Sequence, residues 1–326
     1  MKKILIIQTA FIGDVILATP LIEKLKRFYP QSEIDFLLRK GNEGLLKDHP
    51  KLNEVIIWDK NKSKYNSLAK VSKVIRRNNY DILVNLQRFA SSGLLTYSSK
   101  AKMKIGFIKN PFSFSFTHKF PHVVDQGMHE VDRNLSLIEH ITDKSFQRPV
   151  LYPSDSDRNK IATYQSGPYF CLAPSSVWFT KQFPEEKWIE LIDNLHPDRK
   201  IFLLGAPGDI DLCARIQKAT VHGNVHILAG ELTLLQSAAL MAGAKMNYTN
   251  DSAPMHLASA VNAPITAIYC STIPEFGFGP LSDNSKIVET QKKLECRPCG
   301  LHGKKACPEG HFKCAYTIDI TQFIEA

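Results

Sequence analysis

Apolar residues along the first half of the chain follow two alternating spacings. Ile4–Ile7 is a continuous aliphatic run, and after a glycine turn the apolar positions recur at three- and four-residue intervals as far as Phe28. This pattern predicts a strand, a turn and a helix. Further strands are predicted at 33–38, 54–58 and 80–86, and a further helix at 67–77. Strands that alternate with helices predict a parallel, doubly wound α/β sheet.

The second half of the chain repeats this pattern after a short interruption. Pro149 and Pro153 break the periodicity within 147–157, which predicts an interdomain linker. Strands are predicted at 169–174, 200–204 and 263–269, and a helix at 233–243. A chain of 326 residues is expected to form two domains. We place these domains at 1–152 and 153–305, followed by a C-terminal tail at 306–326.

Asp14 directly follows the predicted first turn. Ligands bind at the carboxyl ends of the strands in open α/β sheets, so this position favours a functional carboxylate. Aspartate is also a common helix cap, because its side chain accepts hydrogen bonds from the amides of a first turn. The local pattern leaves both roles open.

Composition narrows the class of protein. Apolar residues make up 44% of the chain and charged residues 22%, which is typical of a soluble globular protein. Met1–Ile7 resembles the start of a signal peptide, but Gln8 and Asp14 interrupt it, so we expect this run to form the first strand. The chain has no apolar run of about eighteen residues, which predicts no transmembrane helix and a cytoplasmic location.

The positive charge lies in the first half of the chain. Residues 1–155 contain 25 lysines and arginines against 15 aspartates and glutamates, whereas the remainder contains 16 against 17. Such a basic half indicates an anionic lipid, a phosphorylated glycan or nucleic acid as partner, or else a solvated face. Lysines also surround the aromatic stretch Phe112–Phe116. This stretch predicts an edge strand with buried rings, which we favour, or an exposed surface that meets an anionic lipid interface.

The segment Gly13–Pro20 resembles the opening motif of a known enzyme family. Its pattern, Gly-Asp-Val-Ile-x-x-Thr-Pro directly after the first strand, is similar to that of the ADP-heptose:lipopolysaccharide heptosyltransferases, glycosyltransferase family 9. The resemblance implies that Asp14 is the catalytic base and that Gly13 belongs to the donor-binding residues. It also implies two Rossmann-like domains facing across a cleft, which is the glycosyltransferase B fold.

A second motif of this family matches the stretch that follows the strand at 169–174. Ser175, Ser176 and Lys181 stand where the family has hydroxyl residues followed by a lysine, and a helix is expected shortly afterwards. A diphosphate leaving group develops negative charge, which a lysine, hydroxyl groups and helix-start amides can stabilise without a metal. The resemblance therefore gives this role to Lys181, beside Ser175 and Ser176. The alternative is a surface lysine in a polar loop.

A third match lies in the turn that begins at Gly205. The family places an acidic residue here that binds the nucleotide ribose, and Asp209 is the best match, with Asp211 as the alternative. A carboxylate suits a ribose because it can accept hydrogen bonds from two neighbouring hydroxyl groups.

A fourth match begins at Asp251, where the family motif reads Asp-Ser/Thr-Gly-x-x-His-Leu-Ala. The resemblance implies that Asp251 accepts hydrogen bonds from donor-sugar hydroxyls and that Ser252, with the following helix-start amides, faces the diphosphate. The chain departs from the motif at Ala253, where the family has glycine.

Four of the seven cysteines cluster near the C-terminus, at Cys296, Cys299, Cys307 and Cys314. In a cytosolic chain this spacing indicates either a structural zinc site or a group of reduced thiols. The cluster lies far in sequence from the predicted chemistry, so a zinc ion here would be structural, and no cofactor is expected for catalysis. The final segment, Ile318–Ile324, is expected to pack on the first domain, as the last helix does in the glycosyltransferase B fold.

The resemblance covers most of the chain and implies an inverting glycosyltransferase that moves heptose from ADP-heptose to the inner core of lipopolysaccharide. The basic first domain would meet an anionic, membrane-borne lipopolysaccharide precursor at a peripheral membrane surface, on the inner face of the inner membrane, rather than nucleic acid. The alternatives are a relative that uses another nucleotide sugar or glycan acceptor, and a non-catalytic nucleotide-sugar-binding module. A dehydrogenase is disfavoured, because the first turn lacks the Gly-x-Gly-x-x-Gly pattern.

Overall fold

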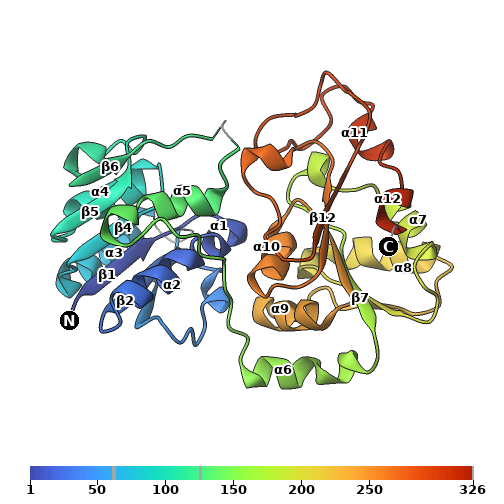
Figure 1. The fold of residues 1–326 in the computed structure, drawn as a ribbon, viewed down its shortest axis with the longest axis horizontal. Coiled ribbons are helices and arrows are strands. Elements are labelled where there is room, and N and C mark those ends of the chain that lie inside the picture. Colours follow the sequence, from blue (N-terminus) through green and yellow to red (C-terminus); the bar gives the residue numbers. More distant parts are fainter. Residues whose placement is uncertain (61–63, 125–126, 325–326) are drawn as a thin grey trace. The chain divides into compact units, whose positions relative to one another are not determined.

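The computed structural model describes residues 1–60, 64–124 and 127–324. The chain forms two compact units, which divide between Tyr152 and Pro153 (Figure 1). The last two residues of the expected tail, 325–326, lie outside the described residues. In the part of the chain that the structure describes, no helix combines the length and the apolar character needed to cross a bilayer.

The first unit is built on a six-stranded parallel sheet with the strand order β3-β2-β1-β4-β5-β6. The predicted strands are confirmed, and the order reverses direction between β1 and β4, which is the topological switch point of a doubly wound sheet. The strands are β1 (Lys3–Ile7), β2 (Glu33–Arg39), β3 (Glu54–Trp58), β4 (Ile82–Asn85), β5 (Met103–Phe107) and β6 (His118–Phe120).

Helices of the first unit pack on its sheet. The helix predicted after β1 is divided in two, because Leu17 and Ala18 separate α1 from α2. A core of apolar side chains from β1, β2, β3 and β4 packs against α3 and α4 on one face of the sheet. The helices are α1 (Ile12–Ile16), α2 (Thr19–Phe28), α3 (Lys64–Asn78), α4 (Ala90–Ser98) and α5 (Glu130–Ser136), with 3₁₀ turns η1 (Glu43–Leu45), η2 (Ser113–Ser115) and η3 (Glu139–Ile141).

The aromatic stretch Phe112–Phe116 is not the edge strand that we favoured. It forms the 3₁₀ turn η2, and the edge strand is β6, which begins two residues later. Only Phe116 is buried, whereas Phe114 is 69% exposed. The amide of Phe112 donates to Oδ1 of Asn110 at 2.9 Å, so the chain turns at the start of the stretch instead of extending.

The second unit has the same topology, with the strand order β12-β11-β10-β7-β8-β9 and its switch point between β7 and β10. Its strands are β7 (Tyr169–Ala173), β8 (Lys200–Leu203), β9 (Val225–Ile227), β10 (Met246–Asn250), β11 (Ile265–Tyr269) and β12 (Ser285–Glu289). Its helices are α6 (Asp155–Ile161), α7 (Glu185–Asp193), α8 (Ile210–Ala219), α9 (Leu234–Gly243), α10 (Ala253–Ala260), α11 (Lys313–Tyr316) and α12 (Thr321–Ile324), with 3₁₀ turns η4 (Ala162–Gln165), η5 (Phe179–Lys181), η6 (Pro207–Asp209) and η7 (Pro274–Phe276).

The C-terminal segment belongs to the second unit. Ile318, Ile320 and Phe323 are buried in the same apolar core as residues of β7, α7 and α8. The ring of Phe323 lies 5.8 Å from that of Phe183 and 6.1 Å from that of Tyr248. The expectation that this segment packs on the first domain is therefore wrong, because its apolar side chains complete the core of its own unit.

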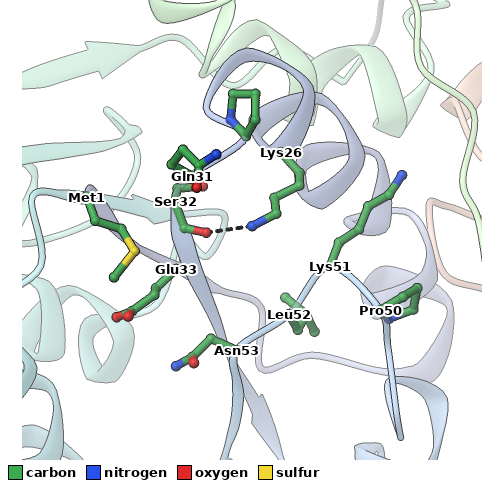
Figure 2. A pocket seen from close by; sticks show the side chains of 10 residues that line it. Met1, Lys26, Gln31, Ser32, Glu33, Pro50, Lys51, Leu52 and Asn53 are labelled. Carbon is green, nitrogen blue, oxygen red and sulfur yellow. Dashed lines mark hydrogen bonds between the residues drawn. The ribbon is translucent and has the colours of Figure 1, made fainter.

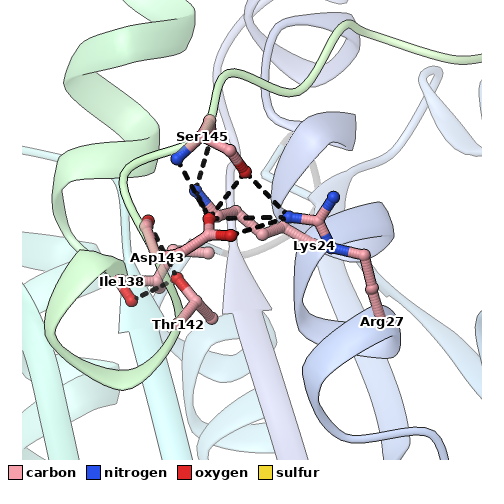
Figure 3. Close-up of polar contacts among 6 residues, drawn as sticks. All are labelled: Lys24, Arg27, Ile138, Thr142, Asp143 and Ser145. Carbon is pink, nitrogen blue, oxygen red and sulfur yellow. Dashed lines mark hydrogen bonds and ion pairs between the residues drawn. The ribbon is translucent and has the colours of Figure 1, made fainter.

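A fully buried lysine joins α2 to the segment that follows η3 (Figure 3). Nζ of Lys24 lies 2.8 Å from Oδ1 of Asp143 and donates to the carbonyl of Ser145 at 2.7 Å. Arg27 approaches the other carboxylate oxygen of Asp143 at 3.3 Å from the solvent side. The Asp143 carboxylate is thus the counter-ion of an ammonium group that water does not reach.

We expect Asp143→Ala to lower the melting temperature more than Lys24→Met does. The first change leaves a buried ammonium without its counter-ion, whereas the second leaves Asp143 at the surface in contact with water. The hydrogen bond from Lys24 lowers the pKa of Asp143 from 3.8 to about 2. The ion pair therefore stabilises the fold above about pH 4 and loses this effect as the pH falls towards 2.

Thermal unfolding of the wild type and both variants, at neutral pH and near pH 2, checks this prediction. The difference between Asp143→Ala and the wild type should be large at neutral pH and small near pH 2. Equal melting temperatures for the two variants at neutral pH would show that the buried ammonium does not depend on Asp143.

Candidate active site

The carboxyl ends of three neighbouring strands carry the residues predicted to bind the donor. Asp251 follows β10, Ser175 follows β7 by two residues, and Gly205 follows β8 by two residues. Because β10, β7 and β8 are adjacent in the sheet, these segments share one edge, at the switch point of the second unit. The order of the strands therefore brings three separate sequence motifs together.

Lys181 and Asp251 form an ion pair at this edge. Nζ of Lys181 lies 2.6 Å from Oδ2 of Asp251, and the two side chains are 15% and 6% exposed. The hydroxyl of Thr272, just beyond β11, donates to the same oxygen at 2.6 Å. The second and fourth sequence motifs therefore meet through their charged residues, and Thr272 is a partner that the sequence analysis missed.

Asn250, the last residue of β10, holds the loop that carries Lys181. Its Nδ2 donates to the carbonyls of Pro174 at 2.9 Å and Ser175 at 3.3 Å, while its Oδ1 accepts from the amide of Phe183 at 2.9 Å. Both ends of the loop are thereby fixed to the strand that precedes Asp251. A fully buried asparagine with these contacts positions Lys181 rather than binding a ligand.

The segment around Gly303 covers the Lys181 loop from the other side. Lys304 donates its amide to Oγ1 of Thr180 at 2.8 Å, and the amide of Thr180 donates to the carbonyl of Lys304 at 3.1 Å. Gly303 has a φ of +75°, and a Cβ there would lie 2.9 Å from Cγ of Lys181. Only glycine fits this close approach, so the C-terminal segment is a wall of the site.

The cysteine cluster lies in the same segment but is not assembled as a metal site. Among the residues that the structure describes, which include all four of these cysteines, no group of three His, Cys, Asp or Glu side chains is placed to hold a metal ion. Cys314 is buried in the apolar core, and burial raises the pKa of its thiol to about 12. The zinc site and the group of reduced thiols both remain predictions. The cluster is also not remote from the site, since the amide of Cys299 donates to the carbonyl of Ser271, next to Thr272.

Ser252 is the N-cap residue of α10, the helix that follows Asp251. Its hydroxyl donates back to the carbonyl of Asn250 at 3.3 Å, and the amide of Met255 donates to its carbonyl at 3.0 Å. Pro254 has no amide hydrogen, so the start of this helix offers fewer donors to an anion than a helix without proline.

Asp209 lies in the turn η6 after β8. Its Oδ2 accepts a hydrogen bond from the amide of Ala206 at 2.7 Å. A Cβ on Gly205 would lie 2.8 Å from Cβ of Asp209, so a larger residue at 205 would displace the carboxylate. Asp209 is half-buried at the same sheet edge as Lys181, and its role towards a ribose remains a prediction.

Asp14 lies at the switch point of the first unit. It belongs to α1, the first helix after β1, and its Oδ2 accepts from the amide of Phe11 at 3.1 Å. The carboxylate therefore contacts the backbone three residues before it, as that of Asp209 does. The structure thus contains the capping contact and also places the side chain, half-buried, at the edge where ligands bind.

A second carboxyl group, that of Glu130, is close enough to Asp14 for their charges to interact. Glu130, the first residue of α5, is buried and accepts a hydrogen bond from Nε of Arg133 at 2.8 Å. Burial raises the pKa of Glu130, the negative charge of Asp14 raises it further, and Arg133 opposes both effects. The amide side chain of Asn134 donates to the carbonyl of Leu17 at 3.1 Å, which ties α5 to the end of α1. The sequence analysis missed this neighbour of Asp14.

The cavity in Figure 2 lies away from these residues. It has a volume of about 310 Å³ and is lined by residues such as Met1, Ser32 and Asn53. Ser32 precedes β2, so the cavity opens at the amino-terminal edge of the first sheet, whereas Asp14 lies at the carboxyl edge. Nothing in its lining matches the chemistry predicted from the motifs.

Two doubly wound units with charged side chains at their switch points define an α/β protein of the class that binds ligands at the carboxyl ends of its strands. The chain matches the sequence model of glycosyltransferase family 9 (heptosyltransferase) over residues 68–310. It is 30% identical over 289 residues to lipopolysaccharide heptosyltransferase 3 of Escherichia coli, an overlap that covers 84% of this chain and 85% of that protein.

Two solved structures show the same fold. The E. coli ADP-heptose lipopolysaccharide heptosyltransferase II is 23% identical, with a TM-score of 0.78, over 92% of this chain and 96% of that chain. A glycosyl transferase family 9 protein from Veillonella parvula DSM 2008 is 23% identical, with a TM-score of 0.82. The overlap covers 99% of this chain and 95% of that chain. The chain therefore belongs to glycosyltransferase family 9 and has the α/β architecture of the glycosyltransferase B fold.

Proposed function

We propose that this chain is an inverting heptosyltransferase that transfers heptose from ADP-heptose to the inner core of lipopolysaccharide. Family membership supports glycosyl transfer, and the curated relatives are named lipopolysaccharide heptosyltransferases. The observation that carries the donor half of the proposal is the Lys181–Asp251 pair at the switch point of the second unit. A lysine there can hold a diphosphate, and a carboxylate beside it can accept from sugar hydroxyls.

In the proposed reaction, an acceptor hydroxyl attacks the anomeric carbon of the heptose from the face opposite the diphosphate. The new bond joins the acceptor oxygen to that carbon, and the bond between the carbon and the ADP oxygen breaks. Asp14 takes the proton of the attacking hydroxyl as general base. Lys181, with Ser175, Ser176 and Ser252, balances the negative charge of the departing ADP, while Asp209 binds its ribose and Gly13 belongs to the donor-binding loop.

The acceptor in this proposal is an anionic lipopolysaccharide precursor. The positive charge of the first half supports it, because phosphate groups on such a precursor are attracted to lysine and arginine. An acceptor of this kind is anchored in a membrane, so we propose that the protein works in the cytoplasm, on the inner face of the inner membrane.

Calorimetric titration of the purified protein with ADP, UDP, GDP and ADP-heptose tests the donor assignment. We expect ADP-heptose to bind more tightly than ADP, and ADP more tightly than UDP or GDP. Preference for another nucleotide would replace ADP-heptose by another donor and leave the general-base role of Asp14 to be tested. Absence of binding to every nucleotide would favour a non-catalytic module.

A further inference from the structure

Three aromatic rings lie together at the surface of α4 and η2. Tyr97 and Phe114 are 52% and 69% exposed, and their ring centroids are 5.9 Å apart. The ring of Phe112 lies 6.0 Å from Tyr97 and 5.9 Å from Phe114. Leu94, one helical turn before Tyr97, is exposed on the same face of α4. We call Leu94, Tyr97, Phe112 and Phe114 the aromatic patch.

The aromatic patch is held in place by buried contacts beneath it. Asn110 donates to the carbonyl of Gln87 at 2.8 Å and accepts from the amide of Phe112. A Cβ on Gly93 would clash with Oδ1 of Asn110, so α4 needs glycine there for the turn to approach it. The exposed rings are therefore fixed on a rigid support, and their exposure is a property of the folded unit.

The stretch of sequence that carries the aromatic patch has cationic but no anionic side chains, and Asp81, just before it, pairs with Lys102 at 2.7 Å. From residue 82 to residue 124 the chain has no aspartate or glutamate, but it has Arg88, Lys100, Lys102, Lys104, Lys109 and Lys119. Large exposed apolar patches mark interaction sites, and those with a single sign of charge around them favour a partner of the opposite sign.

Two of these lysines share the face of the sheet on which the patch lies. Nζ of Lys104 donates to the carbonyl of Tyr97 at 3.3 Å, so its side chain reaches α4. Lys119 is aligned with Gly106 across the β5–β6 pair, two residues along β5 from Lys104. Side chains two residues apart on a strand point to the same face, so Lys104 and Lys119 project towards the α4 side.

We infer that the aromatic patch, with Lys104 and Lys119, is the surface by which this protein docks on an anionic lipid bilayer. Aromatic and aliphatic side chains enter the headgroup region, and lysines beside them are attracted to anionic lipids. This inference deepens the proposed function, on which it rests, because it names the surface that brings the protein to a membrane-anchored acceptor.

Co-sedimentation with lipid vesicles tests the inference. Vesicles of phosphatidylcholine alone are compared with vesicles of phosphatidylcholine and phosphatidylglycerol in equal parts, at low and high salt. The variants are the pair Tyr97→Ser and Phe114→Ser in one chain, and Lys119→Glu. The matched control is Phe146→Ser, which removes a 50% exposed ring outside the patch. Melting temperatures confirm that all variants are folded.

We expect the wild type and Phe146→Ser to bind the anionic vesicles and to bind neutral vesicles more weakly. The double variant and Lys119→Glu should each bind the anionic vesicles about tenfold more weakly than the wild type. High salt should weaken the binding of every protein to the anionic vesicles. Equal binding by the wild type and the double variant would overturn the inference. The inference would also be overturned if the main effect of the double variant were loss of a dimer, as measured by analytical ultracentrifugation. The patch would then bind a second copy of this chain.

Donor titration separates this inference from the proposed function. The vesicle variants should bind ADP-heptose as the wild type does, because the patch is remote in sequence from the donor motifs. Normal vesicle binding without any nucleotide binding would overturn the proposed function alone. Normal donor binding without vesicle binding by the wild type would overturn the docking surface alone.

Discussion

Replacement of Asp14 by asparagine is expected to lower the rate of glycosyl transfer by about 10²-fold or more. Asparagine keeps the size of the side chain and an oxygen that can accept from the amide of Phe11, but it cannot take a proton from the acceptor. The melting temperature and the affinity for ADP-heptose should therefore stay close to those of the wild type. Steady-state kinetics, calorimetry and thermal unfolding measure the three quantities.

Asp209→Asn is the matched control for this experiment. Asp209 makes the same contact with the backbone three residues before it, and it lies after β8 in the second unit. We expect this variant to weaken ADP-heptose binding with a smaller effect on the maximal rate. If Asp14→Asn turned over substrate as fast as the wild type, Asp14 would be a helix cap and not the catalytic base.

The predicted strands and the doubly wound fold class follow from features that the sequence displays directly. Aliphatic runs such as Ile4–Ile7 are continuous because both faces of a parallel sheet are covered, and this signal is local. The alternation with helices then fixes a doubly wound topology, and the topology fixes the switch point. Asp14 could therefore be placed at the end of a strand from sequence alone, whereas the strand before Asp251 was not predicted.

The wrong predictions arose where local spacing was compatible with two structures. Period-two aromatics at Phe112–Phe116 fit a strand, but the side chain of Asn110 competes for the backbone and starts a turn. The C-terminal segment shows apolar residues but carries no signal of which core they enter. Ile318 and Phe323 complete the core of the second unit.

The contacts that shape the site join residues far apart in the chain. Thr180 and Lys304 form two hydrogen bonds although they are 124 positions apart. Glu130 belongs to a different helix from Asp14, yet the charges of their carboxyl groups interact. No local pattern encodes such pairs. From sequence alone, Gly303 cannot be distinguished from the other loop glycines, and its close approach to Lys181 cannot be inferred.

Loss of the Lys181 ammonium is expected to weaken binding of ADP and of ADP-heptose equally, by about tenfold to a hundredfold, because hydrogen bonds to charged groups contribute about 1.5–3 kcal/mol. Asp251→Asn should instead weaken ADP-heptose binding and leave ADP binding nearly unchanged, since Asp251 is proposed to contact the sugar. Calorimetric titration of both ligands against Lys181→Met and Asp251→Asn measures this difference. Equal losses for both variants on both ligands would contradict the proposed division of roles.

Folding must be separated from binding in this experiment, because each single variant leaves the other charge nearly buried without its partner. The double variant Lys181→Met, Asp251→Asn removes both charges, so its melting temperature should recover towards the wild type. Its affinity for ADP should not recover, because the cation that holds the diphosphate is still missing. Gly303→Ala supplies an independent test, since a Cβ at 303 presses on Cγ of Lys181 without changing any charge. If ADP affinity recovered in the double variant, or if Gly303→Ala left it unchanged, Lys181 would stabilise the loop rather than bind the donor.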